Sequence, residues 1–574
     1  MSSAALKPKD ASANKAWLRA LEMTAKIDEQ PLRTFPAVIE ELGARFGAAS
    51  ALISARENFS HAELAARANR YARWALAQGI GKGDTIALIM PNRAEYLAIW
   101  LGITRIGGVV ALININLTGP SLAHCVTVAK PKHIIVAQEL LAAFEAAKIE
   151  TGATVWRHGV AFSDLIGSYA GDALRDHEKR DVTLNDPALL IYTSGTTGLP
   201  KAAYVSHHRV MMWTHWFAGM MGAREDDRLY NCLPMYHSVG GVVASGAVLL
   251  AGGSVVLREK FSASAFWRDV AETGCTIFQY IGELCRYLLK SDAPIPTHHL
   301  RLACGNGLSG DVWEAFQSRF AIPQILEFYA ATEGNFSLYN AEGKPGAIGR
   351  IPSFLAHRFP VALVKQDEGG KWIAVARGEA GEAIAKIAGG AARFEGYTDA
   401  DATNKKILRD VFKPGDAWLK SGDSMRQDAQ GFFYFVDRMG DTFRWKGENV
   451  ATTEVATVLN EFSGIVEANV YGVAVPGADG RAGMAAVEVA GTLDLAGLKA
   501  HLTKRLPAYA RPVFLRVVKS LAITETFKQK KQDLARDGFD PAHVSDPLYA
   551  DIGEGYVSLD DELYTRIKTG RIRI

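Results

Sequence analysis

The sequence predicts an α/β fold with a large N-terminal region of helix-covered parallel sheets, a β-rich subdomain and a small α+β C-terminal domain. Three observations predict it. Helix-like and strand-like segments alternate from residue 32 to about 333, short strands and frequent glycines fill 346–436, and a mixed pattern follows residue 440. Such alternation is typical of parallel sheets covered by helices. The 574 residues exceed one ordinary domain.

The alternating region contains continuous apolar runs that favour buried strands. Thr85–Met90 and Val109–Asn114 are two of these runs, and the segments 62–76 and 96–107 have helical character. The same pattern resumes at Ala188. Because parallel strands need crossover connections, the intervening helices are expected to cover the sheets.

Residues 239–257 form an uncharged run that just reaches the length of a membrane span. Gly252 and Gly253 interrupt it, and the following SVVL has the character of a strand. We therefore expect a buried helix followed by a buried strand. The N-terminus lacks the apolar core of a signal peptide.

We expect three parts in the chain: an N-terminal arm at 1–31, a large domain at 32–439 that includes the β-rich segment 346–436, and a small domain at 440–574. The last part has helix-like segments with strand-like runs between them. Its size, roughly 130 residues, is within the usual range for a separate domain.

Charge and cysteine usage exclude several classes of protein. The net charge of +2 gives no support for a nucleic-acid-binding protein. The five cysteines are dispersed and form no CxxC pair. This predicts buried thiols in a reducing compartment such as the cytoplasm, without disulfides or a zinc site.

The stretch YTSGTTGLPK, residues 192–201, predicts a phosphate-binding loop. Gly195 and Gly198 permit a tight backbone path whose N–H groups can form an anion nest. Lys201 adds a positive charge, but Ala202 follows it, so the loop is not a Walker A motif. The hydroxyl donors of the loop are Thr193, Ser194, Thr196 and Thr197.

Together with six further motifs, this loop resembles the signature of the acyl-adenylate-forming superfamily, which includes acyl-CoA synthetases, luciferases and peptide-synthetase adenylation domains. The companion motifs are LPMYHSVGG (233–241), GNGL (305–308), FYAATEGN (328–335), SGD (421–423), DRMGDTFRWKG (437–447) and TFKQKK (526–531).

Within the superfamily, the chain resembles the fatty acid transport protein / very-long-chain acyl-CoA synthetase family, from about Leu76 to the C-terminus. The run 394–423, the run 437–455 and the tail 538–567 carry this resemblance. Ala330 stands where many members have glycine, and its methyl group would narrow the nucleotide or acyl path. No segment resembles the N-terminal membrane helix of animal members, which puts their transport role in doubt for this chain.

The resemblance implies roles for residues of the large domain. His237 would contact the acyl carboxylate and gate the acyl site, although a histidine packed in the core is the plainer alternative. Tyr329 would stack on adenine, Thr332 would contact the α-phosphate, and Glu333 would hold Mg²⁺. The implied adenine loop comprises Gly305, Asn306 and Gly307.

The resemblance also implies roles near and beyond residue 420. Asp423 and Arg438 would bind the ribose, and Gly440 would be the hinge between domains. Lys446 and Gly447 would enter the site for the CoA step. Lys528 would serve adenylation, whereas Lys530 and Lys531 are expected to be solvated.

The implied activity is that of a long- or very-long-chain fatty acid–CoA ligase, with Mg²⁺ as cofactor and ATP and CoA as co-substrates. Two alternatives stay open: a CoA ligase for another carboxylate such as a bile acid or an aromatic acid, and a fatty acid uptake or binding protein. A peptide-synthetase adenylation domain is disfavoured because no carrier-protein segment follows.

The acyl chain is expected to enter an apolar tunnel that starts near His237. Trp213 and Trp216, on the predicted helix around 211–221, are candidate walls, although such aromatic residues are more often part of a core. The segment 13–27 places Trp17, Leu18 and Leu21 on one helix face. This face could lie on an anionic membrane surface or pack on the protein itself.

Overall fold

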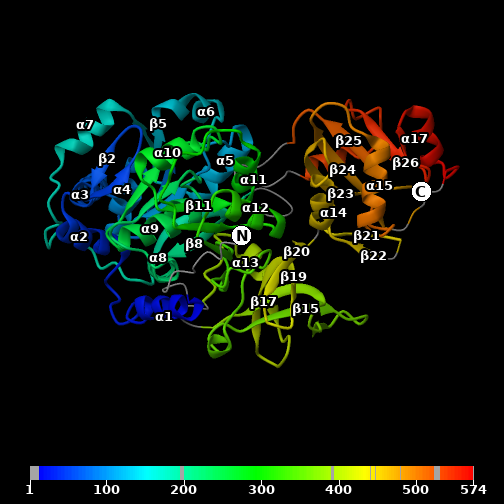
Figure 1. Ribbon diagram of the computed structural model, residues 1–574. Coiled ribbons are helices and arrows are strands. Elements are labelled where there is room, and N and C mark those ends of the chain that lie inside the picture. The colour runs from blue at the N-terminus through cyan, green and yellow to red at the C-terminus, as the bar shows by residue number, and fades with distance from the viewer. Residues whose placement is uncertain are drawn as a thin grey trace. The chain divides into compact units, whose positions relative to one another are not determined.

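The computed structural model of the protein describes residues 12–193, 200–388, 393–439, 441–446, 448–476, 478, 480–521, 531–572 and 574. The chain folds into two units (Figure 1). One unit comprises Met1–Val361, Ala385–Leu419 and Gly431–Phe433, and the other comprises Ala362–Ile384, Lys420–Gln430 and Tyr434–Ile574.

The first sheet of the large unit has the strand order β6-β5-β3-β4-β7-β8. All neighbouring strands are parallel except the pair β7 and β8, which form an antiparallel hairpin. The strands are β3 (Thr85–Ile89), β4 (Val109–Leu112), β5 (His133–Ala137), β6 (Thr154–His158), β7 (Pro187–Thr193) and β8 (Lys201–Ser206). The associated helices are α3 (His61–Ala77), α4 (Ala94–Arg105), α5 (Gly119–Ala129), α6 (Leu141–Ala146) and α7 (Val160–Ser168).

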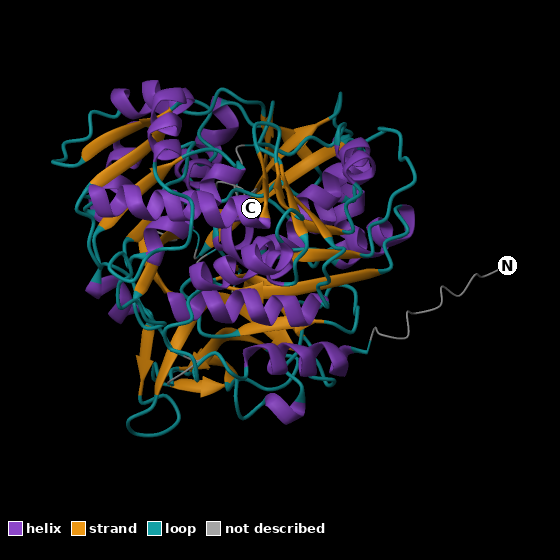
Figure 2. Ribbon diagram, turned by 90° about the vertical axis from the view of Figure 1, so that its left-hand side faces the viewer, coloured by secondary structure: helices purple, strands orange, loops and turns teal. Residues whose placement is uncertain are grey.

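The second sheet has the order β14-β13-β12-β11-β9-β10-β1-β2, with antiparallel strands only at its two ends. Figure 2 shows helices alongside the strands of these sheets. The strands are β1 (Ser50–Ile53), β2 (Asn58–Ser60), β9 (Arg228–Asn231), β10 (Ser254–Leu257), β11 (Ile277–Ile281), β12 (Leu302–Asn306), β13 (Gln324–Ala330) and β14 (Ser337–Asn340). Helices of this region are α8 (His207–Met221), α9 (Ala244–Leu250), α10 (Phe266–Thr273), α11 (Gly282–Lys290) and α12 (Gly310–Arg319).

Two expectations about buried segments are confirmed here. The run 239–257 forms a short π-helix (Val239–Val243), then α9, and then β10, which is buried along its whole length. All five cysteines are buried and none is in a disulfide. Among the described residues, no helix combines the length and the apolar character that a membrane crossing requires.

The predicted β-rich segment forms a sheet with the order β16-β15-β17-β19-β18, in which β20 also pairs with β19. Its strands are β15 (Val361–Gln366), β16 (Trp372–Ala374), β17 (Ala380–Lys386), β18 (Ile407–Arg409), β19 (Ala417–Gln427) and β20 (Phe433–Arg438). The short helix α13 (Ala400–Lys405) precedes β18.

The C-terminal segment has a hydrophobic core of its own, which includes Trp445, Val470, Met484 and Phe514. Its five-stranded sheet has the order β23-β24-β25-β26-β27, and the hairpin β21–β22 is a separate pair. The strands are β21 (Phe443–Trp445), β22 (Glu448–Val450), β23 (Ile465–Ala474), β24 (Arg481–Val489), β25 (Phe514–Val518), β26 (Leu548–Asp551) and β27 (Tyr556–Ser558). The helices are α14 (Thr452–Asn460), α15 (Leu495–Arg505), α16 (Gln532–Asp537) and α17 (Asp561–Lys568).

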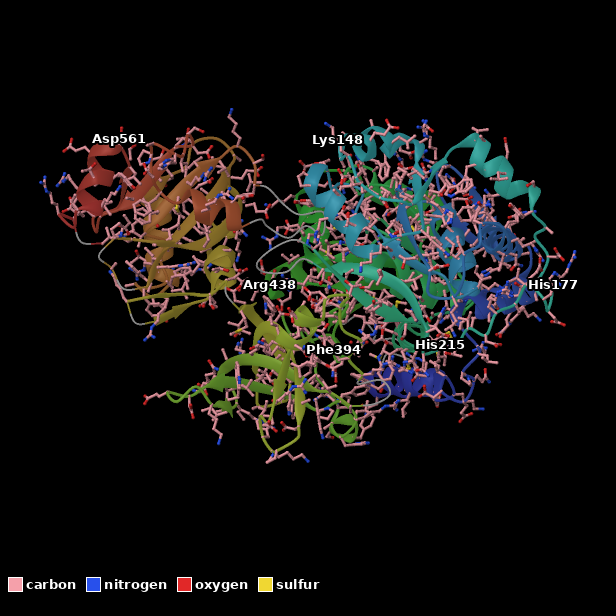
Figure 3. The ribbon with its side chains drawn as sticks, turned by 180° about the vertical axis from the view of Figure 1, so that it is seen from behind. Lys148, His177, His215, Phe394, Arg438 and Asp561 are labelled. Carbon is pink, nitrogen blue, oxygen red and sulfur yellow. The ribbon has the colours of Figure 1, made fainter. Side chains whose placement is uncertain are left out.

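The N-terminal helix α1 (Ala13–Thr24), which precedes α2 (Phe35–Phe46), packs against α8. Trp17 is 1% exposed, and its ring lies 5.9 Å from that of Trp216 and 5.5 Å from that of Tyr339. In Figure 3, the labelled His215 of α8 lies beside α1, and it lines one hollow together with Met23. Trp17 therefore packs on the protein itself, the second of the two alternatives, whereas Leu18 of the same helix is 51% exposed.

Two helical glycines give opposite predictions for replacement by alanine. A Cβ on Gly102 of α4 would lie 2.3 Å from the Ala68 carbonyl oxygen, whereas a Cβ on Gly167 of α7 would meet nothing within 4 Å. Gly102→Ala should destabilise the protein by about 1–3 kcal/mol through overpacking. Gly167→Ala should be neutral or stabilise by up to about 1 kcal/mol through helix propensity. Thermal unfolding of both variants measures this, and equal midpoints would contradict the close α3–α4 packing.

Candidate active site

The predicted phosphate loop connects β7 to β8. Thr193 and Lys201 are paired at the loop end of this hairpin, so the loop begins and ends at one pair of residues. The Lys201 ammonium lies 6.0 Å from the ring centre of Tyr397. Ser194, Gly195, Thr196, Thr197 and Gly198 lie outside the described residues.

The predicted adenine loop begins with the last two residues of β12, next to the strand that carries Tyr329. Gly305 is paired with Glu327 of β13, so the carboxyl ends of both strands meet at one edge of the sheet. Gly307 has φ +80°, and a Cβ on Gly305 would lie 2.2 Å from the Tyr280 carbonyl oxygen. Glycine is required at both positions, once for conformation and once for space.

Glu327 is a buried carboxyl group that sequence reasoning missed. One of its oxygens accepts a hydrogen bond from the Leu308 N–H (3.1 Å), and the other accepts one from the Tyr280 hydroxyl (2.5 Å). Burial raises the pKa of Glu327 to about 8, although these hydrogen bonds act in the opposite direction. The residue thus ties the adenine loop to β11 and β13. An acid inside an otherwise apolar strand is the signal that could have identified it.

The segment that contains His237 lies beside the segment that contains Thr332. The hydroxyls of Ser238 and Thr332 are hydrogen-bonded at 3.1 Å. His237 is half-buried, and its ring centre lies 4.7 Å from that of Tyr236. The structure therefore brings together the residues proposed to contact the acyl carboxylate and the α-phosphate.

Glu333 has two partners that the sequence analysis did not single out. Its Oε1 accepts a hydrogen bond from the Tyr397 hydroxyl (2.8 Å) and lies 3.3 Å from the Lys406 ammonium. Burial alone would raise the pKa of Glu333, but Lys406, the residue's own backbone N–H and Tyr397 together lower it. The side chain is therefore an anion, which is the form that a hard cation such as Mg²⁺ requires.

No group of three or more His, Cys, Asp and Glu side chains suited to a metal ion occurs in the part of the chain that the structure describes. A divalent cation at Glu333 would consequently need most of its oxygen ligands from the phosphates of a nucleotide and from water. This is the usual way in which Mg²⁺ is held at nucleotide sites, so the residues present fit such an ion.

The buried Arg209 of α8 fixes the backbone around Glu333. Its guanidinium donates to the carbonyl oxygens of Thr332 (2.8 Å), Gly334 (3.0 Å) and Arg393 (3.0 Å). The Glu395 carboxylate lies 3.6 Å away and also accepts from the backbone N–H of Ser206. These bonds hold the 332–334 segment to the start of α8.

A cavity of about 90 Å³ lies behind the same segment. Trp213 and Trp216, the expected wall residues of α8, both line it. Ala331 and Gly334 connect its wall to the segment that carries Thr332 and Glu333. The other apolar lining residues are Trp17, Met212, Phe336, Tyr339 and Phe359, and the polar ones are His208, Arg209, Asn335, Ser337, Arg393 and Glu395.

In the second unit, Asp423 of β19 and Arg438, the last residue of β20, form an ion pair at 3.9 Å. The Ser421 hydroxyl accepts a hydrogen bond from the Asp423 N–H (3.0 Å), so serine supplies the hydroxyl group of this motif. The pair of a carboxylate and a guanidinium offers acceptors and donors suited to ribose hydroxyls.

Lys446 lies at the turn between β21 and β22, in the left-handed conformation with φ +52°. Its ammonium is 5.7 Å from the ring centre of Trp445. Gly440, Gly447 and Lys528 lie outside the described residues. Lys531 is not a solvated side chain as expected, because it donates to the Thr452 hydroxyl and lies 3.4 Å from Asp441.

Comparisons with known proteins agree with this architecture. Residues 39–397 match the AMP-binding enzyme family, and residues 454–528 match the AMP-binding enzyme C-terminal domain. The chain is 40% identical to long-chain fatty acid transport protein 1 of Mus musculus, over 94% of this chain and 88% of the relative. It is 39% identical to long-chain fatty acid transport protein 6 of Mus musculus, over 90% of this chain and 87% of the relative.

Solved structures share the fold. ATP-bound MatB from Rhodopseudomonas palustris aligns with a TM-score of 0.74 and 27% identity, over 86% of this chain and 98% of that protein. The anthranilate CoA ligase AuaEII in complex with anthranoyl-AMP aligns with a TM-score of 0.77 and 21% identity, over 89% of this chain and 98% of that protein. One chain contains both matching domains, together with the β7–β8 hairpin and the glycine-lined edge of the second sheet. This protein therefore belongs to the AMP-binding enzyme family of adenylate-forming ligases.

Proposed function

We propose that this protein is an AMP-forming long- or very-long-chain fatty acid–CoA ligase. One observation carries the proposal: a cavity rich in aromatic side chains, with Arg209 and Glu395 among its polar lining residues, lies beside the segment that carries Thr332 and Glu333. Its aromatic side chains suit the part of a hydrocarbon chain next to the carboxylate, and at about 90 Å³ the cavity has room for only that part of a long chain. The similarity to long-chain fatty acid transport proteins supports the choice of acid.

In the first half-reaction, a carboxylate oxygen of the fatty acid attacks the α-phosphorus of ATP. The bond from that phosphorus to the α,β-bridging oxygen breaks, which gives acyl-AMP and pyrophosphate. Both reactants are anions, so positive charge must offset their repulsion. Lys201, Lys528 and the hydroxyl and N–H donors of the loop are assigned this role, and Thr332 is assigned to the α-phosphate.

Glu333 would hold Mg²⁺, which when bound neutralises phosphate charge. Tyr397 donates to the carboxylate and so fixes its orientation. For the nucleoside, we assign adenine to Tyr329 and the loop Gly305–Gly307, and ribose to Asp423 and Arg438. His237 is assigned to the carboxylate end of the acyl group, beside Ser238 and Thr332.

In the second half-reaction, the CoA sulfur attacks the acyl carbon, the bond to the AMP oxygen breaks, AMP leaves with that electron pair, and the thiol proton is released to solvent. Lys446 and Gly447 are assigned to this step and Lys528 to the first. Because these lysines lie far apart in the sequence, we propose a large domain at 32–439 and a small domain at 440–574 that turns about Gly440 between the steps. ATP and CoA are cytoplasmic metabolites, so we place the enzyme in that compartment.

The first prediction concerns the substrate. ATP–pyrophosphate exchange should occur with long-chain acids and exceed that with octanoate, cholate or benzoate, because the cavity favours a flexible hydrocarbon chain. Addition of CoA should then yield the thioester. If only cholate or benzoate supported exchange, the adenylation mechanism would stand but the assignment of a fatty acid substrate would be wrong. If no acid supported exchange, a binding protein would be favoured.

The second prediction separates the two lysines. Lys528→Ala should lower ATP–pyrophosphate exchange by about 10²–10³, the usual effect of removing a charge-stabilising donor. It should leave thioester formation from supplied acyl-AMP within about twofold of the original protein. Lys446→Ala should show the reverse pattern and so serves as the matched control. Equal loss of both steps in either variant would contradict domain rotation between the steps.

The third prediction concerns the cavity. Trp213→Ala should shift the preferred acid toward longer or bulkier chains, because removal of the indole enlarges the space beside α8. Trp213→Phe should shift the preference less, and neither variant should change KM for ATP by more than about threefold. Rates measured across a chain-length series test this. An unchanged chain-length profile in a stable Trp213→Ala protein would exclude the cavity as the acyl site.

A further inference from the structure

Lys406 lies beside the carboxylate that is expected to hold the metal. Its ammonium is 3.3 Å from Oε1 of Glu333, and the Lys406 side chain is 27% exposed. The same oxygen accepts the hydrogen bond from Tyr397. One carboxylate oxygen therefore contacts both a cation and a phenol.

The backbone that carries Tyr397 and Lys406 is anchored to the strand after the phosphate loop. The Thr398 N–H donates to the Ala202 carbonyl (3.0 Å), and the Tyr204 N–H donates to the Gly396 carbonyl (3.1 Å). Ala203 and Tyr397 form an isolated β-bridge and pack with Ala402 in a small apolar cluster. Lys406 is thus attached to the same strand, β8, that begins with Lys201.

The intervening residues are also fixed. The Asp399 carboxylate caps α13 by accepting from the backbone N–H groups of Asp401 and Ala402. The Thr403 hydroxyl accepts from the Tyr397 N–H (2.9 Å) and donates to the Asp399 carbonyl (2.9 Å). A set of local hydrogen bonds therefore fixes the backbone of Lys406 at the C-terminal end of α13. Its side chain is long and flexible, so the ammonium group can change partners while the backbone stays in place.

A lysine in this position has a second use once nucleotide binds. A triphosphate carries more negative charge than one carboxylate, so the ammonium is expected to turn toward it even without a metal, and a divalent ion at Glu333 would repel the ammonium further. The flexible four-carbon side chain carries three donors and can turn toward phosphate oxygens a few ångströms away. Arg209 cannot do this, because its donors are bound to three backbone carbonyls.

We propose that Lys406 is a further catalytic residue of the adenylation half-reaction. It neutralises Glu333 before nucleotide binds, and it then binds the β- and γ-phosphates that leave as pyrophosphate. This inference rests on the proposed function, since it takes Glu333 as the residue at the polyphosphate. It adds to Lys201 and Lys528 a third lysine on the triphosphate, and it assigns no part to Lys406 in the CoA step.

The test compares Lys406→Met with Lys405→Met. Lys405 is the adjacent residue of α13 and is exposed, so its replacement removes the same charge without touching Glu333. Lys406→Met should lower ATP–pyrophosphate exchange by at least about 10-fold and leave thioester formation from acyl-AMP within about twofold. Lys405→Met should match the original protein in both assays, and Lys406→Arg should recover part of the exchange.

A binding measurement without metal supplies a readout that is independent of turnover. Calorimetric titration in EDTA should show weaker ATP binding by Lys406→Met, by about 10-fold, and unchanged AMP binding. Equal behaviour of the Lys406→Met and Lys405→Met proteins would overturn the inference. Equal weakening for ATP and AMP, with a lowered thermal midpoint, would also overturn it, because it would show a structural role only.

Failure of the proposed function gives a different result. If the original protein exchanges pyrophosphate with none of the acids, the ligase assignment fails. The comparison of ATP with AMP in EDTA then decides on Lys406 alone, since it requires no acid substrate. Loss of ATP binding with retained AMP binding would keep Lys406 as a phosphate ligand, and no difference would exclude it.

Discussion

The buried guanidinium of Arg209 connects three parts of the large unit that are distant in sequence. It binds the backbone of the 332–334 segment and the carbonyl of Arg393, and it lies beside Glu395. Removal of a charged group from water is costly unless it is paired and hydrogen-bonded, and these partners meet that requirement. Desolvation lowers the pKa of Arg209. Because the burial of Arg209 depends on all of these partners, the backbone of residues 332–334 has little conformational freedom.

That rigidity lets one short segment serve two surfaces. One side of it carries Thr332, which bonds to Ser238, and Glu333, which bonds to Tyr397 and Lys406. Its other side forms a wall of the aromatic cavity. In the proposed ligase, the phosphates and the hydrocarbon chain would therefore lie on opposite sides of one short segment. Such proximity is what attack of a carboxylate on phosphorus requires.

The second constraint is close backbone approach at the end of the β11–β12 pair. A Cβ on Gly282 would lie 1.9 Å from the Gly307 carbonyl oxygen, and one on Gly305 would lie 2.2 Å from the Tyr280 carbonyl oxygen. Glu327 then bonds to the N–H of Leu308 from the adjacent strand. Gly282 and Gly305 therefore allow close backbone contact at this edge of the second sheet. The buried carboxyl group of Glu327 on the adjacent strand then fixes the loop.

Periodicity and local motifs were enough to predict the α/β class, the β-rich segment and the final α+β segment, because these are properties of neighbouring residues. Folding in three dimensions was needed to show that Trp17 belongs to the core, and that Tyr397 and Lys406 meet Glu333. These contacts join residues more than sixty positions apart, and no local pattern encodes them. They exist because sheet pairing and the packing of α1 on α8 bring those positions together.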